Sequence, residues 1–158
     1  MTISDLGSIG EIIAAVATIA TLGYLALQIR QANRANEIVA ITRIAESSED
    51  WLGSVSRDAE LYRLYRLGVL SPDSLSKEEF GRFQVLVLQF LRGTESGWLH
   101  HRSNLVSADY WSGYERSIAF IIGSPGGRRA YERNRQFLGP EYAEAIDRIL
   151  EQDNAGRR

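Results

Sequence analysis

The chain has 158 residues, no cysteine, two histidines and a formal net charge of −2. The absence of cysteine excludes disulfide bonds and thiolate metal sites, and two histidines are too few for an imidazole-rich metal site. No global basic excess favours nucleic acid, so no nucleic-acid partner is expected. A chain of this length favours a single globular domain.

The most apolar segment covers residues 12–29 and carries no charged side chain: IIAAVATIATLGYLALQI. As a helix it is about 27 Å long, close to the ~30 Å thickness of a bilayer's hydrocarbon core. Tyr24 lies near one end, and Arg30 and Arg34 follow directly, as in an interfacial anchor. The sequence therefore predicts an N-terminal transmembrane helix over residues 1–29.

Every lysine and arginine lies at or after Arg30, whereas only Asp5 and Glu11 are charged before it. The positive-inside rule then places the N-terminus outside and the rest of the chain in the cytoplasm, at a bacterial inner membrane. Two alternatives stay open. One is a cleaved signal peptide, although no basic region precedes the apolar run. The other is a helix buried in a soluble domain or a soluble dimer.

One face of this segment is made mostly of small and polar residues, at alternating spacings of four and three. Such a repeat stays on one face of a slightly under-wound helix. Small residues allow helices to approach closely in lipid, and Thr and Gln hydrogen-bond across such contacts. We therefore expect homo-oligomerisation through this face or, in a larger ring, a narrow aqueous path. The seam consists of Gly7, Glu11, Ala14, Thr18, Thr21, Leu25 and Gln28.

The remainder of the chain has helical periodicity throughout and no strand-like alternation. We expect a helical stalk over residues 30–52, which continues the first helix, and a helical cytoplasmic domain over residues 53–158. Ser76 and Glu79 form a capping box, and Ser124 precedes a proline at a helix start. The predicted fold is all-α, with a long N-terminal helix followed by a compact bundle of about four to five helices.

Several phrases carry a family resemblance: LGYLALQIRQANRAN, LYRLYRLGVLSPDSLSKEEFGRF, ESGWLHHR and DYWSGYERSIAFIIGSPGGRRAYERNRQFLGPEY. Over nearly its whole length the chain resembles a family of small uncharacterised bacterial proteins with a hydrophobic start and a helical remainder. The resemblance implies no particular activity. In layout alone, the chain is also similar to the membrane-pore accessory proteins of some RNA-targeting CRISPR systems, which form rings.

The candidate polar site on the predicted helix 77–102 consists of Arg92, Glu95, His100 and His101. Adjacent histidines point about 100° apart on a helix, so both cannot face one metal ion. The interval between Arg92 and His100 is longer than in helical ribonuclease domains, and no His-Glu-x-x-His or nucleotide motif is present. A buried ion pair that fixes helix register is the simpler interpretation. A polar binding pocket, or an enzyme using Glu95, His100 or His101, is the alternative.

Arg128 and Arg129 follow the helix start at Ser124 and are a candidate contact for lipid or another anion. Ordinary N-capping is the simpler explanation of this segment. Together these features predict a membrane-anchored, self-associating protein with a structural or partner-binding role. Its expected partners are itself and membrane lipid, with no particular protein partner indicated. We expect no enzymatic activity, cofactor or metal. The alternative is a homo-oligomeric pore lined by the polar face of the first helix.

Overall fold

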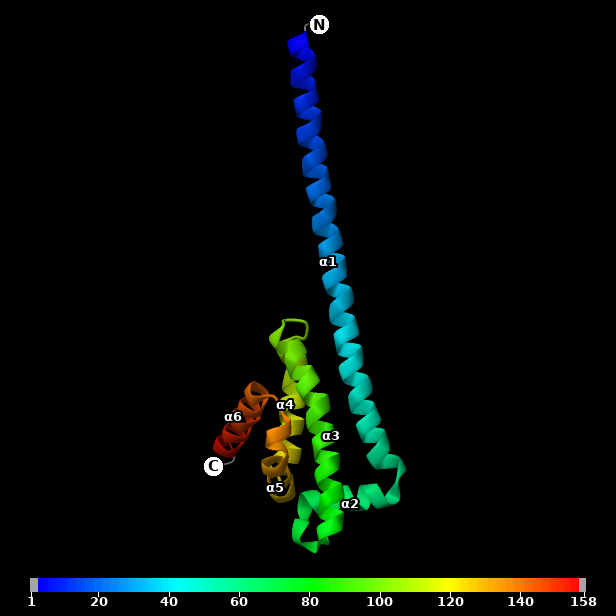
Figure 1. Ribbon diagram of the computed structural model, residues 1–158, viewed down its shortest axis with the longest axis vertical. Helices are drawn as coiled ribbons and strands as arrows, with labels where there is room; N and C mark the ends of the chain where they lie inside the picture. The colour runs from blue at the N-terminus through cyan, green and yellow to red at the C-terminus, as the bar shows by residue number, and fades with distance from the viewer. Residues whose placement is uncertain (1–2, 157–158) are drawn as a thin grey trace. The chain divides into compact units, whose positions relative to one another are not determined.

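The computed structural model describes the backbone of residues 3–156 and the side chains of residues 10, 11 and 13–156. These residues form six α-helices and two short 3-10 helices, and none of them lies in a strand (Figure 1). The all-α prediction is therefore confirmed. The chain divides into two compact units, Met1–Ile38 and Val39–Arg158.

The first helix, α1, runs without interruption from Ile3 to Arg57. In the first unit the large apolar side chains that the structure describes are exposed, from Leu25 at 46% to Ile19 at 70%. Among the described residues, the stretch Ile13–Arg57 is the one helix long and apolar enough to cross a membrane, and its most apolar window has no buried residue. The predicted apolar N-terminal helix is thus present, and it has the length and composition of a membrane span.

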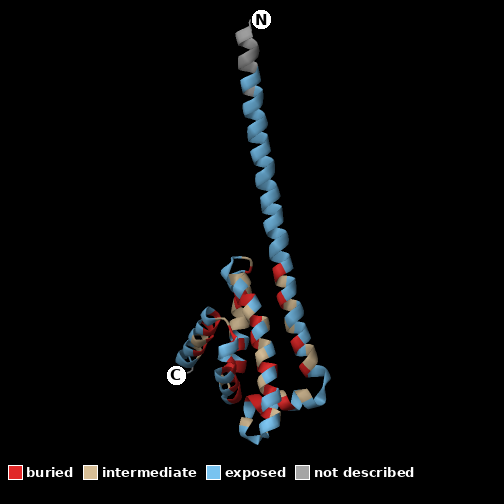
Figure 2. Ribbon diagram, viewed as in Figure 1, coloured by how far each residue is buried: buried red, intermediate tan, exposed pale blue. Residues whose placement is uncertain are grey.

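The C-terminal part of α1 belongs to the second unit, where burial begins at Ala40 (Figure 2). Ala40 and Ile44 pack with Val106, and Trp51 and Val55 enter the main core. The indole nitrogen of Trp51 donates to the Leu86 carbonyl at 3.0 Å. The second half of the predicted stalk, from Val39, is therefore part of the folded domain.

Five further α-helices complete the second unit, and this number agrees with the predicted bundle of about four to five helices. Four of them have a side-chain N-cap, from Asp58, Ser76, Ser107 and Ser124. Ser76 and Glu79 form the predicted capping box. The last helix, α6, ends at Gly156. In chain order the elements are α2 (Ala59–Leu70), η1 (Pro72–Ser74), α3 (Lys77–Arg102), α4 (Ala108–Ile122), α5 (Pro125–Asn134), η2 (Arg135–Phe137) and α6 (Pro140–Gly156).

The long helix α3 is the centre of the bundle and contacts α2, α4 and α5. Its Phe83 and Leu91 are fully buried, together with Ile118 of α4 and Tyr142 of α6. Burial of such apolar side chains is the main favourable contribution to folding.

Three glycines allow close helix packing, two of them on α5 and the third, Gly68, where α2 packs against α3. A Cβ atom on Gly126 would lie 1.8 Å from the Gly68 carbonyl oxygen, and one on Gly127 would lie 1.9 Å from that of Ile121. A Cβ atom on Gly68 would meet the Phe83 ring at 2.2 Å. The glycines of the SPGGRR segment therefore serve helix packing, and this packing brings α5 against the turn at Pro72.

Candidate functional site

The seam on α1 is exposed wherever its side chains are described, and Gly7 lies outside those residues. The hydroxyl of Thr18 donates to the Ala14 carbonyl and that of Thr21 to the Ala17 carbonyl, each at 2.8 Å. The amide nitrogen of Gln28 donates to the Tyr24 hydroxyl at 2.7 Å. These donors therefore have partners within the helix itself, as apolar surroundings require. The other described members are Glu11, Ala14 and Leu25.

Glu95 anchors the start of α6 to α3. One of its carboxylate oxygens accepts from the backbone N–H of Gly139 at 2.7 Å, and the other accepts from Arg92 at 2.8 Å. The Gly139 carbonyl accepts the first hydrogen bond of α6 from Ala143, so Gly139 stands at the N-cap position. The carboxylate thus has a structural partner on another helix, 44 residues away.

Arg92 and Glu95 form an ion pair, but only the Glu95 side chain is largely buried. The Glu95 side chain is 13% exposed, whereas that of Arg92 is 58% exposed. The register-fixing contact of Glu95 is the one with Gly139, and the bond to Arg92 is a surface contact of small energetic value.

The two histidines lie in different surroundings. His101 stacks on Trp111 with ring centroids 5.8 Å apart, and its Nδ1 lies 3.0 Å from the Val106 carbonyl oxygen. The carbonyl of His100 accepts from Leu105 where the chain reverses, and Asn104 adopts the left-handed conformation there. Asn tolerates this conformation better than most residues do. The four predicted polar residues therefore do not converge on one site.

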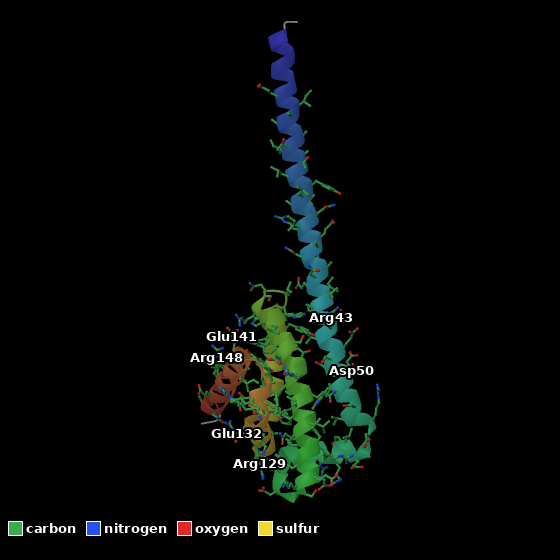
Figure 3. All side chains as sticks on the ribbon, in the orientation of Figure 1. Arg43, Asp50, Arg129, Glu132, Glu141 and Arg148 are labelled. Atoms are coloured by element: carbon green, nitrogen blue, oxygen red, sulfur yellow. The ribbon has the colours of Figure 1, made fainter. Side chains whose placement is uncertain are left out.

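A groove of about 530 Å³ lies among α3, α4 and α6 and includes His101 but not Arg92, Glu95 or His100. Arg102 lines it, pairs with Glu141 and lies 5.0 Å from the centre of the Trp98 ring. The groove is lined by acids and bases in near balance, namely Glu115, Glu141, Glu144, Arg102 and Arg148; Figure 3 labels Glu141 and Arg148. Its charge therefore favours neither an anion nor a cation.

Arg128 and Arg129 are neighbours in sequence but line different hollows. Arg128 lies with Asp147 and Glu151, so its surroundings are partly acidic. The Asp147 carboxylate accepts hydrogen bonds from Arg135 and from the Tyr131 hydroxyl, each at 2.8 Å. Burial, with this bond to Asp147, raises the pKa of Tyr131. The two arginines consequently do not form one anion contact.

Arg129, labelled in Figure 3, lines a pocket of about 390 Å³ between the turn at Pro72, the start of α3 and α5. Arg133 lies one turn further along α5 and lines the same pocket. The guanidinium carbons of Arg129 and Arg133 are 4.8 and 5.2 Å from the centre of the Phe80 ring. We call this the basic pocket; its lining residues are Pro72, Asp73, Leu75, Ser76, Lys77, Phe80, Arg129 and Arg133.

The basic pocket contains three cationic side chains and one acid. Asp73 pairs with Arg129 at 3.2 Å, and its side chain is 94% exposed. Among the described residues, neither Arg133 nor Lys77 has a carboxylate within 4.0 Å. The nearby Glu79 is bound by Arg63 at 2.5 Å, and this bond, with those from Ser76, lowers the pKa of Glu79 to about 2.

The sequence indicated Arg129 as a candidate anion contact, with Arg133 further along the same basic segment, but it did not indicate Lys77 or Phe80. Arg129 and Arg133 are four residues apart on one helix, so they share a face, and this spacing was a signal available in the sequence. Lys77 and Phe80 lie about 50 residues earlier and reach the arginines only through the packing of α3 against α5.

No family model, curated protein or solved structure matches the chain.

Proposed function

We propose that the chain is a membrane-anchored, self-associating helical protein with a structural or partner-binding role. The observation that carries this proposal is the apolar surface of α1. Ile13, Val16, Ile19, Leu22 and Ile29 are each 60% or more exposed. Apolar surface costs about 25 cal/mol per Å² in water, so a helix of this kind is stable only where lipid or another chain covers it.

The charges around the span support an orientation. Arg30 and Arg34 follow the apolar run, and no cationic side chain precedes it. We therefore propose that α1 spans a bacterial inner membrane with the N-terminus outside and the second unit in the cytoplasm.

Self-association is proposed through the seam. Ala14, Thr18 and Thr21 are small, so a second helix can approach their backbone closely. Because both threonine hydroxyls already donate within α1, close van der Waals packing is the favourable term at this contact. The expected partner is a second copy of α1.

The first test is the mass of the full-length protein after extraction in a mild detergent. We expect extraction to need detergent and to give one defined oligomer. Ala14→Leu with Thr18→Leu should shift the mass toward the monomer, since larger side chains separate the helices. Val16→Leu and Ile19→Leu, which lie off the seam, provide the matched control.

Full-length protein that stays soluble without detergent would contradict the membrane anchor. An oligomer that survives the seam substitutions unchanged would contradict the seam and leave the anchor standing.

The orientation of the chain in the membrane is tested by cysteine labelling. The chain has no cysteine, so a single introduced thiol is labelled without background. Single substitutions Ser4→Cys and Ala155→Cys place one thiol at each end of the chain. A membrane-impermeant maleimide added to intact spheroplasts should label the first and not the second. The reverse labelling would contradict the proposed orientation.

A further inference from the structure

We propose that the basic pocket binds a phosphate group, carried either by a lipid headgroup or by a soluble phosphate compound. This inference does not depend on the membrane anchor, because every lining residue belongs to the second unit.

The fold holds an excess of positive charge around the basic pocket. The pocket is lined by Lys77, Arg129 and Arg133 against the single acid Asp73, a formal excess of two positive charges. Like charges held close together repel, and an anion between them relieves the repulsion. Asp73 satisfies only Arg129 and is itself almost fully exposed.

The two guanidinium groups of the basic pocket lie over one aromatic ring. Phe80 is 5% exposed and forms part of the core, so its ring is a fixed platform. Arg129 and Arg133 both lie over that ring, at 4.8 and 5.2 Å. Cation–π contact with a fixed ring restricts the planar groups while leaving their N–H donors available. Guanidinium forks of this kind match the geometry of phosphate oxygens.

The basic pocket is also large enough for a phosphate group. One water molecule in the liquid occupies about 30 Å³. The pocket volume of about 390 Å³ therefore corresponds to many water molecules and exceeds the volume of a phosphate group. The remaining space accommodates the group to which the phosphate is attached. Its apolar lining comes from Pro72 and Leu75 beside Phe80.

The test uses full-length protein in a neutral detergent, titrated with inorganic phosphate by calorimetry at constant ionic strength, with chloride as the reference anion. We expect saturable binding. Arg129→Gln with Arg133→Gln should weaken it at least about tenfold, because two charge-assisted hydrogen bonds are lost. Arg128→Gln removes one positive charge from the position next to Arg129. Because Arg128 lines the other hollow, this substitution should change the affinity by no more than about twofold.

A second variant tests the pocket in the opposite direction. Asp73→Asn removes its one acid and should tighten phosphate binding by about three- to tenfold. If Arg129 served only to hold the turn through Asp73, this substitution would not improve binding. Because Asp73 is exposed, the variant is expected to fold.

The source of the phosphate is distinguished by lipid retention. Native mass spectrometry of the same protein with added phosphatidic acid or phosphatidylcholine compares an accessible phosphate monoester with a zwitterionic headgroup. Retention of phosphatidic acid that depends on Arg129 and Arg133 identifies a lipid headgroup as a ligand. Binding of inorganic phosphate without such retention identifies a soluble compound. Absence of saturable binding in both measurements, or equal weakening by Arg128→Gln, would overturn the proposal.

Discussion

At the scale of single residues, Glu95 shows how a carboxylate that resembles part of an active site can instead hold two helices together. We expect Glu95→Ala to lower the free energy of unfolding by about 1–3 kcal/mol, because the Gly139 N–H loses its acceptor in a largely buried place. Chemical denaturation of the full-length protein in detergent measures the change.

Two variants separate this role from the ion pair. Glu95→Gln keeps a carbonyl oxygen for Gly139 and should cost clearly less than Glu95→Ala. Arg92→Ala removes an exposed partner and should cost no more than about 1 kcal/mol. A larger loss from Arg92→Ala than from Glu95→Ala would contradict this assignment.

Glu79 gives a pH-dependent prediction at the same scale. Its hydrogen bonds from Arg63 and Ser76 lower its pKa from an ordinary value of 4.5 to about 2. Because the folded-state pKa is lowered, its stabilising contribution is present above about pH 4.5 and is lost as the pH falls toward 2. A carboxyl NMR titration should give a low pKa that rises in Arg63→Ala. An unchanged titration in that variant would show that Arg63 is not the cause.

Single residues also mark the limit of what the sequence could predict. Helical spacing placed Arg92 and Glu95 together, because local periodicity determines which neighbours share a face. It could not indicate Gly139 as the partner of Glu95, because that contact joins residues 44 positions apart. It also could not separate Arg128 from Arg129, whose surroundings depend on α6 and on the start of α3.

At the scale of helices, the close packing of α5 is the most sensitive feature. Gly126→Ala would place a Cβ atom 1.8 Å from a backbone carbonyl oxygen of α2, so the helices must separate. We expect a loss of about 1–3 kcal/mol or more, as for other overpacked core positions. Thermal unfolding of the full-length protein provides the measurement.

The matched control for Gly126 lies on α3. A Cβ atom on the exposed Gly81 meets nothing within 4 Å. Gly81→Ala should therefore stabilise the protein by about 0.5–1 kcal/mol, since alanine loses less backbone entropy in a helix. Equal effects of the two substitutions would show that close packing is not the reason for Gly126.

The helix α1 allows the anchoring and pore hypotheses to be separated. Because Thr18 and Thr21 donate to their own backbone, we expect the reconstituted oligomer to be electrically silent in planar bilayers. Conductance that decreased or changed selectivity in Glu11→Gln and Thr18→Val would contradict this expectation and favour the pore. An unchanged conductance in those variants would place any path elsewhere.

Most helix positions could be predicted, since helix starts depend on a few adjacent residues. Ser76 with Glu79, and Ser124 before a proline, placed two of them correctly. The basic pocket could not be predicted, because it requires the packing of α3 against α5, together with the close contacts of α5 with α2 at Gly126 and of α2 with α3 at Gly68. Pairwise packing of helices distant in sequence leaves no periodic pattern along the chain.

At the scale of the whole molecule, the boundary of the second unit has a direct consequence. The sequence predicted a domain beginning at residue 53, whereas the compact unit begins at Val39. Trp51 lies in its core, with ring centroids 5.5 Å from Tyr65 and 5.2 Å from Phe90. Removing a buried tryptophan costs about 3–5 kcal/mol, a large share of a typical total stability of about 5–15 kcal/mol.

Two truncated chains therefore should behave differently. A chain beginning at Arg30 keeps Ala40, Ile44 and Trp51 and should be a soluble, cooperatively folded monomer without detergent, because the exposed apolar span is gone. A chain beginning at Gly53 loses these residues and exposes the surfaces they cover, so it should unfold at much lower temperature or aggregate. Circular dichroism melting and light scattering distinguish the two. Equal stability of both chains would mean that α1 contributes nothing to the domain, and an oligomeric Arg30 chain would place self-association outside the seam.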